Sequence, residues 1–283
     1  MFTALQRDAG RWRFKPAPQP KAVPKEKPLP DSLTVARKVA AGDAKGFFTR
    51  EGDTFRAGNG RLVLTGRLGN GNMVRSVTLD GEEKPYGQYN AMLQTRDAEG
   101  RNRWTNGNTV KAVEGRVTDG IAVIELTSTT TAGLEGFEIT HRLTLPPGTP
   151  WFISEIVSVK NTGTLPLHLK GLYFRLYNEF KSIPEKLPPN LWGMPPSGYW
   201  LDETTGRFFG AVASRTSDIR IFFWFDKPGE GQHPDACLEL DKTDLAPNEA
   251  FVPAAPVYLF CVAGRGSNDT WMTTIQDLMR VLE

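Results

Sequence analysis

The stretch LEGFEITHRLTLPPGTPWFISEIVSVKNTGTLPLHLKGLYFRLY, residues 134–177, decides the fold of this 283-residue chain. It predicts three successive β-strands, 134–145, 151–161 and 165–177, because β-branched and aromatic residues alternate with polar ones. The segment Pro146-Pro147-Gly148 separates the first two strands and is typical of a tight turn. These features predict an antiparallel sheet in the middle of the chain.

The same strand signals continue on both sides of this stretch. Asp119-Gly120 is a dipeptide that tolerates positive φ, so it predicts a hairpin between two further strands. So many strands without helices between them predict an all-β fold, a large two-sheet antiparallel sandwich. The other strands are expected at 47–50, 54–57, 61–65, 73–79, 109–118, 121–130, 207–214, 219–225, 236–240 and 257–263.

One helix is expected, at the C-terminus and outside the central stretch. Residues 267–282 place Trp271, Ile275 and Leu278 at helical spacing on one apolar stripe, and residues 31–41 could form one or two turns. We expect the C-terminal helix to pack on the outside of a sheet. Residues 31–283 are thus predicted to form a single β-sandwich domain that ends in a helix.

Residues 1–30 differ from the rest of the chain in charge and composition. They contain seven Lys or Arg residues against Asp8 and Glu26, a net charge of +5, so the remainder carries −3 of the overall +2. The run KPAPQPKAVPKEKPLP, residues 15–30, contains six prolines and predicts an extended tail. It is either a solvated linker or a docking arm for an acidic protein partner, with Trp12 and Phe14 as anchors.

Composition excludes several classes of function. A mildly acidic body does not favour nucleic acid, and no apolar run approaches the roughly 20 residues of a membrane helix. Cys237 and Cys261 are too few for a disulfide framework and lack metal-ligand spacing, and no motif indicates a cofactor. The N-terminus lacks the apolar core of a signal peptide, so we expect a soluble protein. It would be periplasmic or at the cell surface if a leader was removed.

Two long polar segments, residues 80–108 and 178–206, interrupt the strand pattern and are predicted to be loops. Flat aromatic side chains stack on sugar rings and polar neighbours bind sugar hydroxyls, so these loops could bind carbohydrate. The same aromatics could equally pin the loops to the sandwich. The predicted ligand-binding residues in or beside these loops are Tyr86, Tyr89, Trp104, Tyr177, Trp192, Tyr199, Trp200 and Asp202.

A histidine and a glutamate stand out in the first two strands of the central stretch. Phe137, Ile139, His141, Leu143 and Leu145 alternate toward the core, and the next strand presents an apolar face of Trp151, Ile153, Glu155, Val157 and Val159. If the turn sets Leu145 opposite Trp151, His141 lies across from Glu155. Such a pair is either a satisfied structural contact or an acid–base couple. A register slip would break it.

The third strand, 165–177, has apolar residues on both faces and is expected to lie in the middle of a sheet. Near its end, Tyr173, Arg175 and Tyr177 share one face and form a row of aromatic rings and polar groups. This row leads directly into the second predicted loop. It is therefore a candidate floor for a binding site.

One passage resembles a known family. Asn161-Thr162-Gly163 followed by LHLKGLYF, residues 167–174, is similar to a segment of the aldose 1-epimerase, or galactose mutarotase-like, family. The resemblance covers about 45 residues and implies the two-sheet supersandwich of that family and affinity for sugars. The family's catalytic histidine falls two positions before the tyrosine of its motif, where this chain has Gly171, and no counterpart of its catalytic glutamate is found. Mutarotase activity is therefore not expected.

Three functions remain open from the sequence. The first is a non-catalytic carbohydrate-binding or carbohydrate-associated sandwich. The second is a lyase or hydrolase that acts on sugars and uses some of His141, Glu155, His168, Tyr173 and Arg175. The third is a structural or assembly subunit that docks through its N-terminal arm.

Overall fold

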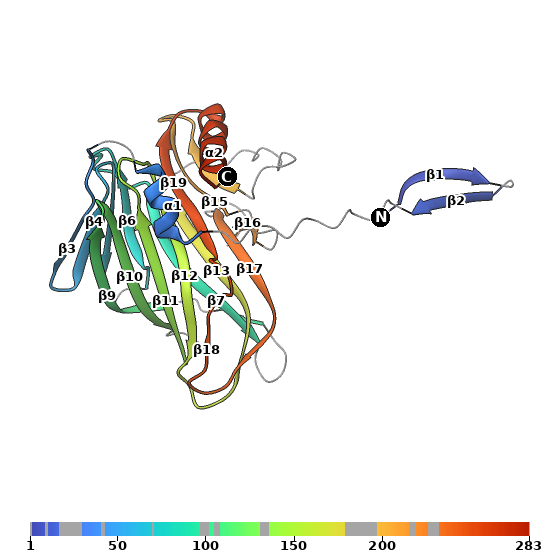
Figure 1. The fold of residues 1–283 in the computed structure, drawn as a ribbon, viewed down its shortest axis with the longest axis horizontal. Helices are drawn as coiled ribbons and strands as arrows, with labels where there is room; N and C mark the ends of the chain where they lie inside the picture. Colours follow the sequence, from blue (N-terminus) through green and yellow to red (C-terminus); the bar gives the residue numbers. More distant parts are fainter. Residues whose placement is uncertain are drawn as a thin grey trace.

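The protein is an antiparallel β-sandwich with two helices in a computed structural model (Figure 1). The structure describes residues 2–8, 11–16, 30–40, 43–69, 71–96, 102–104, 108–130, 136–178, 197–214, 219–225 and 232–282. Two large sheets form the body, and the short N-terminal strands β1 (Phe2–Asp8) and β2 (Arg11–Pro16) form a separate two-stranded sheet. The all-β prediction is thus confirmed.

The first large sheet has eight strands in the order β14-β15-β19-β12-β11-β10-β9, with β18 paired to β12. Its hairpin at Asp119-Gly120 has positive φ at both residues, as predicted. The strands are β9 (Asn108–Thr118), β10 (Ile121–Thr130), β11 (Phe137–Leu145), β12 (Trp151–Asn161), β14 (Ser197–Asp202), β15 (Arg207–Ala213), β18 (Ala250–Phe251) and β19 (Tyr258–Arg265).

The second large sheet has nine strands in the order β16-β17-β13-β7-β6-β5-β4-β3, with β8 paired to β7. The third strand of the central stretch, β13 (Leu167–Asn178), lies inside this sheet as expected. The others are β3 (Phe47–Glu51), β4 (Thr54–Gly58), β5 (Leu62–Arg67), β6 (Val74–Leu79), β7 (Gly87–Arg96), β8 (Asn102–Trp104), β16 (Ile219–Phe225) and β17 (Gln232–Leu245).

The main core lies between the two sheets. The alternating side chains of β11 from Phe137 to Leu145 are buried there, as the period-two pattern predicted, and so are Leu172 and Phe174 of β13. Burial of apolar surface on this scale is the principal force that holds the two sheets together.

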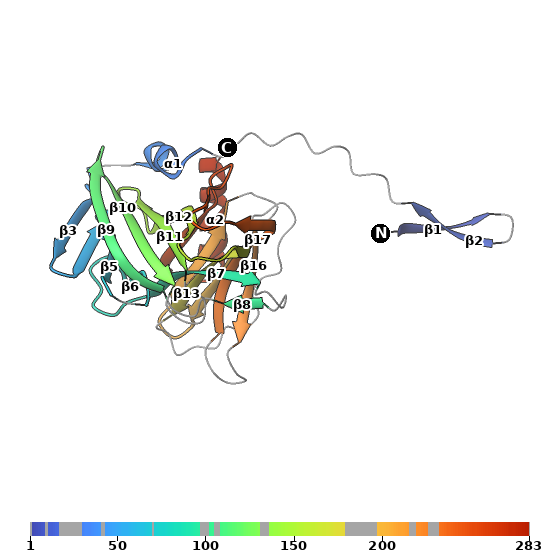
Figure 2. The same cartoon turned by 90° about the horizontal axis from the view of Figure 1, so that it is seen from below.

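A second apolar cluster covers the outer face of the eight-stranded sheet. Helices α1 (Ser32–Val39) and α2 (Asn268–Leu282) lie on that side (Figure 2). Trp271, Ile275 and Leu278 of α2 and Val35 of α1 pack against Trp151 and its neighbours. The prediction of a C-terminal helix packed on the outside of a sheet is confirmed. The short helix predicted within residues 31–41 is α1, and Asp31 caps it by accepting a hydrogen bond from the Thr34 amide at 2.8 Å.

The predicted facing of β12 is wrong. From Thr144 to His141 the pairing is offset by one residue from the predicted register, so Arg142 lies opposite Glu155 and His141 lies opposite Ile156, and a further irregularity follows between His141 and Thr140. A one-residue shift exchanges the two faces of a strand. Phe152 and Ile156 therefore enter the main core, whereas Trp151 and Ile153 face the helices.

Three strands occur where the sequence predicted only loops. The first predicted loop, residues 80–108, contains β7, an interior strand of the nine-stranded sheet, and the short β8 paired to it. The second, residues 178–206, contains β14. In β7 the inward residues Tyr89, Ala91 and Leu93 are buried in the main core, while polar residues alternate with them. One largely polar face made this strand resemble a loop in composition.

Candidate functional site

The outer face of the nine-stranded sheet carries a polar and aromatic surface on β7, β13 and β17. Tyr173, Arg175 and Tyr177 of β13 lie opposite Met92, Asn90 and Gln88 of β7. Alternate residues of both strands are in the main core, so these six share the opposite face. We call them the outer-face row. The row of Tyr173, Arg175 and Tyr177 expected from the sequence thus lies beside three β7 positions. Asn90 is a polar residue of the first predicted loop that suits sugar binding, whereas Met92 and Gln88 were not expected from the sequence.

The ends of this row differ in accessibility. Asn90 and Tyr173 are buried, whereas Arg175, Tyr177 and Gln88 are partly exposed. The guanidinium carbon of Arg175 lies 5.9 Å from the ring centroid of Tyr177, within range of a cation–π contact. A ligand would therefore meet the row at its Arg175 and Tyr177 end.

Hydrogen bonds hold the floor of the row in place. The Tyr173 hydroxyl donates to Gln94 Oε1 at 3.0 Å, and Gln94 is itself buried. The Asn72 amide donates to Gln88 Oε1, which ties the row to the segment before β6. Buried polar groups with partners keep one geometry, so the floor is preorganised.

Neighbouring strands add further positions to the same face. Asp235 of β17 lies opposite Arg175, and Trp104 of β8 lies opposite Gln94. The sequence argument proposed Trp104 for ligand binding but did not connect Asp235 with Arg175. Only the strand order brings these positions together, because they are 60 or more residues from Arg175 along the chain.

Gly171 lies on this face beside the bulge of β13. A Cβ atom at this position would be 3.0 Å from Cε2 of Tyr173 and 3.2 Å from the Leu238 carbonyl oxygen. Both contacts are closer than a normal van der Waals separation. The Tyr173 ring therefore occupies the space that a larger side chain at 171 would need.

His168 lies further along β13 and pairs with a carboxylate. Its Nδ1 is 2.5 Å from Asp244 Oδ1, and the imidazole is one quarter exposed. The bulge between Leu169 and Gly171 and seven sequence positions separate it from Arg175. At about 3.3 Å per residue, the two are roughly 20 Å apart along the strand.

His141 is placed in the core between the sheets and away from any surface. Its Nε2 lies 3.0 Å from the Tyr89 hydroxyl oxygen and 2.8 Å from Ser154 Oγ, and the side chain is fully buried. Burial lowers the pKa of His141 to about 3 and raises that of Tyr89 well above its usual range. His141 is therefore neutral at ordinary pH. The predicted pair of His141 with Glu155 is wrong.

Glu155 is on the opposite face of β12, beneath α1. Its Oε2 accepts hydrogen bonds from Ser32 Oγ at 2.7 Å and from Arg142 Nη1 at 3.3 Å. The Ser32 hydroxyl also lies 3.1 Å from Thr144 Oγ1. This carboxylate fastens α1 to the eight-stranded sheet and is far from the outer-face row.

Several aromatic residues predicted to bind a ligand are packing residues instead. Tyr199 stacks on Trp271 of α2 with ring centroids 4.5 Å apart, and Trp200 is 1% exposed. Tyr89 lies in the core beside His141, and Tyr86 is also buried. Trp192 lies outside the described residues. These tyrosines and Trp200 therefore pack against the sandwich, which is the second alternative given for the aromatic residues of these segments.

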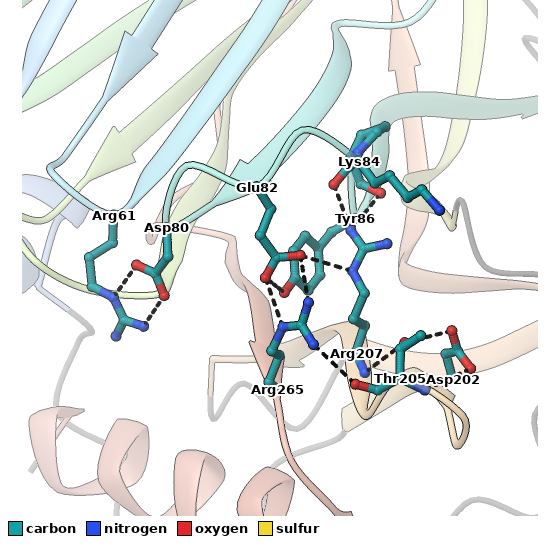
Figure 3. Close-up of polar contacts among 10 residues, drawn as sticks. Arg61, Asp80, Glu82, Lys84, Tyr86, Asp202, Thr205, Arg207 and Arg265 are labelled. Atoms are coloured by element: carbon teal, nitrogen blue, oxygen red, sulfur yellow. Dashed lines mark hydrogen bonds and ion pairs between the residues drawn. The ribbon is translucent and has the colours of Figure 1, made fainter.

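Tyr86 and Asp202 take part in a polar cluster where the β6–β7 connection meets β15 and β19 (Figure 3). Arg207 lies over the Tyr86 ring, 4.1 Å from its centroid, and its Nη2 donates to the carbonyl oxygens of Lys84 and Pro85. Glu82 Oε2 lies 3.3 Å from Arg207 Nε, and Arg265 binds both oxygens of Glu82. This cluster joins the two sheets at one end.

Asp202 closes the turn between β14 and β15. Its carboxylate accepts hydrogen bonds from the Thr205 hydroxyl at 2.6 Å and the Thr204 amide at 3.0 Å, and these bonds lower the pKa of Asp202. Arg265 Nη1 reaches the Thr205 carbonyl oxygen at 3.2 Å. Asp202 is therefore a turn-forming residue in this structure.

The described residues contain neither a metal-binding cluster nor a membrane-spanning helix. Within the described ranges, no group of three or more His, Cys, Asp or Glu side chains is arranged to hold a metal ion. No helix in the same part of the chain is long and apolar enough to cross a membrane.

The fold and the outer-face row define the chain as an all-β sandwich protein with a polar and aromatic sheet face. No family model matches its sequence, and no curated protein matches it. Among solved structures, it is similar to a candidate aldose 1-epimerase from Klebsiella pneumoniae, with 11% identity over 88% of this chain and 91% of that chain and a TM-score of 0.47.

Two larger proteins also resemble it. The α-galactosidase AgaA of family GH36 from Geobacillus stearothermophilus gives 12% identity over 78% of this chain and 41% of that chain, with a TM-score of 0.38. A polysaccharide lyase gives 13% identity over 85% and 35%, with a TM-score of 0.37. The chain thus spans less than half the length of these two. With TM-scores below 0.5, the three resemblances give no information on activity.

Proposed function

We propose that this chain binds carbohydrate at the Arg175 and Tyr177 end of the outer-face row, as a binding protein that does not turn its ligand over. The observation that carries the proposal is the strand register, which sets Tyr173, Arg175 and Tyr177 beside the amide-bearing Gln88 and Asn90. An aromatic ring next to planar polar groups is the chemistry that sugar recognition requires.

Each group has a distinct part in such a site. The partly exposed Tyr177 ring offers a flat surface for the apolar face of a pyranose. Arg175 donates hydrogen bonds to hydroxyl oxygens, and the Gln88 amide can both donate and accept. Donors and acceptors side by side suit the vicinal hydroxyls of a neutral sugar.

Four features support the non-catalytic part of the proposal. Sugar chemistry of the epimerase or lyase kind needs a general acid and a general base close together. His141 is buried in the core, Glu155 lies under α1, and the His168–Asp244 pair is roughly 20 Å from Arg175 along β13. In addition, Tyr173 fills the space beside Gly171, where a catalytic side chain would have to fit.

A glycan array followed by titration calorimetry tests this proposal. We expect the full chain to bind at least one neutral glycan, and Tyr177→Ala or Arg175→Ala to weaken binding roughly tenfold or more, as for the central residues of a binding site. Arg56→Ala is the matched control, because Arg56 is an exposed arginine on β4 of the same sheet. Its affinity should not change.

The outcomes that contradict the proposal are equally specific. If the full chain binds no glycan, or if Arg56→Ala loses as much glycan affinity as Arg175→Ala, the outer-face row is not the binding site. If the chain cleaves uronic-acid polymers and Tyr173→Phe or His168→Ala abolishes this turnover, the chain is a lyase and the non-catalytic proposal is wrong.

A further inference from the structure

The β1–β2 hairpin is a candidate interaction element that sugar binding does not use. Neither large sheet continues it, and both views draw it apart from the body (Figures 1 and 2). An isolated two-stranded hairpin is at best marginally stable in water, because it has no partner for an apolar face. This hairpin therefore gains stability if a surface covers it.

The register of the hairpin places three apolar positions on one face, together with Arg7, and most of the basic positions on the other. Leu5 lies opposite Phe14, and Arg7 opposite Trp12, so these positions share one face. The other face has Arg11, Arg13 and Lys15 opposite Asp8, Gln6 and Ala4. Residues 1–16 contain four cations and one acid, a net charge of +3. A complementary surface would be apolar with carboxylates around it.

The body has such a surface around Asn161, at the end of β12. The Asn161 side chain donates to the carbonyl oxygens of Leu165 and Leu245, and its amide donates to Glu249 O, so three segments meet there. Leu165 and Val252 are 71% and 64% exposed, the two most exposed large apolar side chains of the described residues. Asp244 and Glu249 are exposed carboxylates on the same segments. We call Leu165, Asp244, Glu249 and Val252 the Asn161 surface.

We propose that the hairpin of one chain docks on the Asn161 surface of a second copy of this chain. The charges are complementary, because the first 30 residues carry +5 and the remainder carries −3. Residues 17–30 contain five prolines, a composition typical of extended spacers. Mutual exchange of hairpins gives a closed dimer in which each copy donates one hairpin and accepts one.

Sedimentation velocity over a concentration series tests the proposal with full-length protein. We expect a dimer that dissociates at high salt and is lost in Trp12→Ser/Phe14→Ser and in Leu165→Ser/Val252→Ser. Val117→Ser is the control, because Val117 is 47% exposed on β9 and not part of the Asn161 surface. It should remain dimeric.

Each other outcome overturns the proposal. A full chain that stays monomeric throughout the series excludes docking on a second copy. A dimer that survives the hairpin variant does not use the hairpin, and one that is lost in the hairpin variant but kept in the Leu165→Ser/Val252→Ser variant uses another surface. Glycan binding is measured separately, so failure of the dimer leaves the proposed function untouched.

Discussion

Replacing Glu82 by alanine is expected to lower the free energy of unfolding by about 3 kcal/mol, because it removes a carboxylate that pairs with both Arg207 and Arg265. The Arg207 side chain is 8% exposed, and Glu82 is 23% exposed. Loss of this carboxylate leaves more of the desolvation cost of the buried Arg207 charge uncompensated, and Tyr86 and Arg265 lose hydrogen bonds at the same time. Urea denaturation measures the change.

Asp80→Ala is the matched control for this prediction (Figure 3). Asp80 pairs with Arg61 through two short hydrogen bonds, but the two side chains are 47% and 42% exposed. Exposed pairs contribute at most about 1 kcal/mol, so the control should lose little stability. The double variant Glu82→Ala/Arg207→Met should be more stable than Glu82→Ala alone. Equal losses of stability in Glu82→Ala and Asp80→Ala would contradict the prediction, because they would show that burial of the Glu82–Arg207 pair does not increase its contribution to stability.

The second large effect concerns acid stability and His141. The folded state keeps His141 neutral down to about pH 3, whereas the unfolded chain takes up this proton near pH 6.5. Between these values the unfolded state binds more protons. The free energy of unfolding therefore falls as the pH drops from 6.5 toward 3, by about 1.4 kcal/mol per pH unit from this residue. Above pH 6.5, His141 contributes no pH dependence.

His141→Gln isolates this contribution, because carboxylate titration is common to both proteins. Denaturation at a series of pH values should give a slope in the acid range that is smaller in the variant by one proton. Above pH 7 the two slopes should be parallel, whatever the offset in stability. Equal slopes between pH 4 and 6 would show that the folded protein protonates His141 without difficulty.

Much of the fold could be predicted from the sequence because it depends on local periodicity. The period-two pattern of β11, the Asp119-Gly120 turn and the apolar stripe of α2 each depend on near neighbours in the chain. β7 was missed because most of its outward positions, among them Gln88, Asn90 and Gln94, are polar. A strand with one polar face has the average composition of a loop, and only its alternation could have identified it.

The candidate site was predicted in part. Tyr173, Arg175 and Tyr177 share a face because they lie on one strand, a feature that the sequence contains directly. Tyr86, Tyr199 and Trp200 were assigned to ligand binding because aromatic residues in polar segments are consistent with either binding or packing. The structure shows them buried. Nothing in the sequence separates the two cases, since burial depends on distant segments such as α2.

Sequence alone predicted the all-β class, the C-terminal helix, the basic N-terminal segment and the shared face of Tyr173, Arg175 and Tyr177. These follow from the alternation of residues and from charge, which need no knowledge of distant contacts. Only the tertiary structure decided the register of β11 and β12, which separated His141 from Glu155, and the strand order that set Arg175 beside Asn90 and Asp235. The physical reason is that a one-residue shift preserves the local pattern while it exchanges every side chain between the core and the outer face.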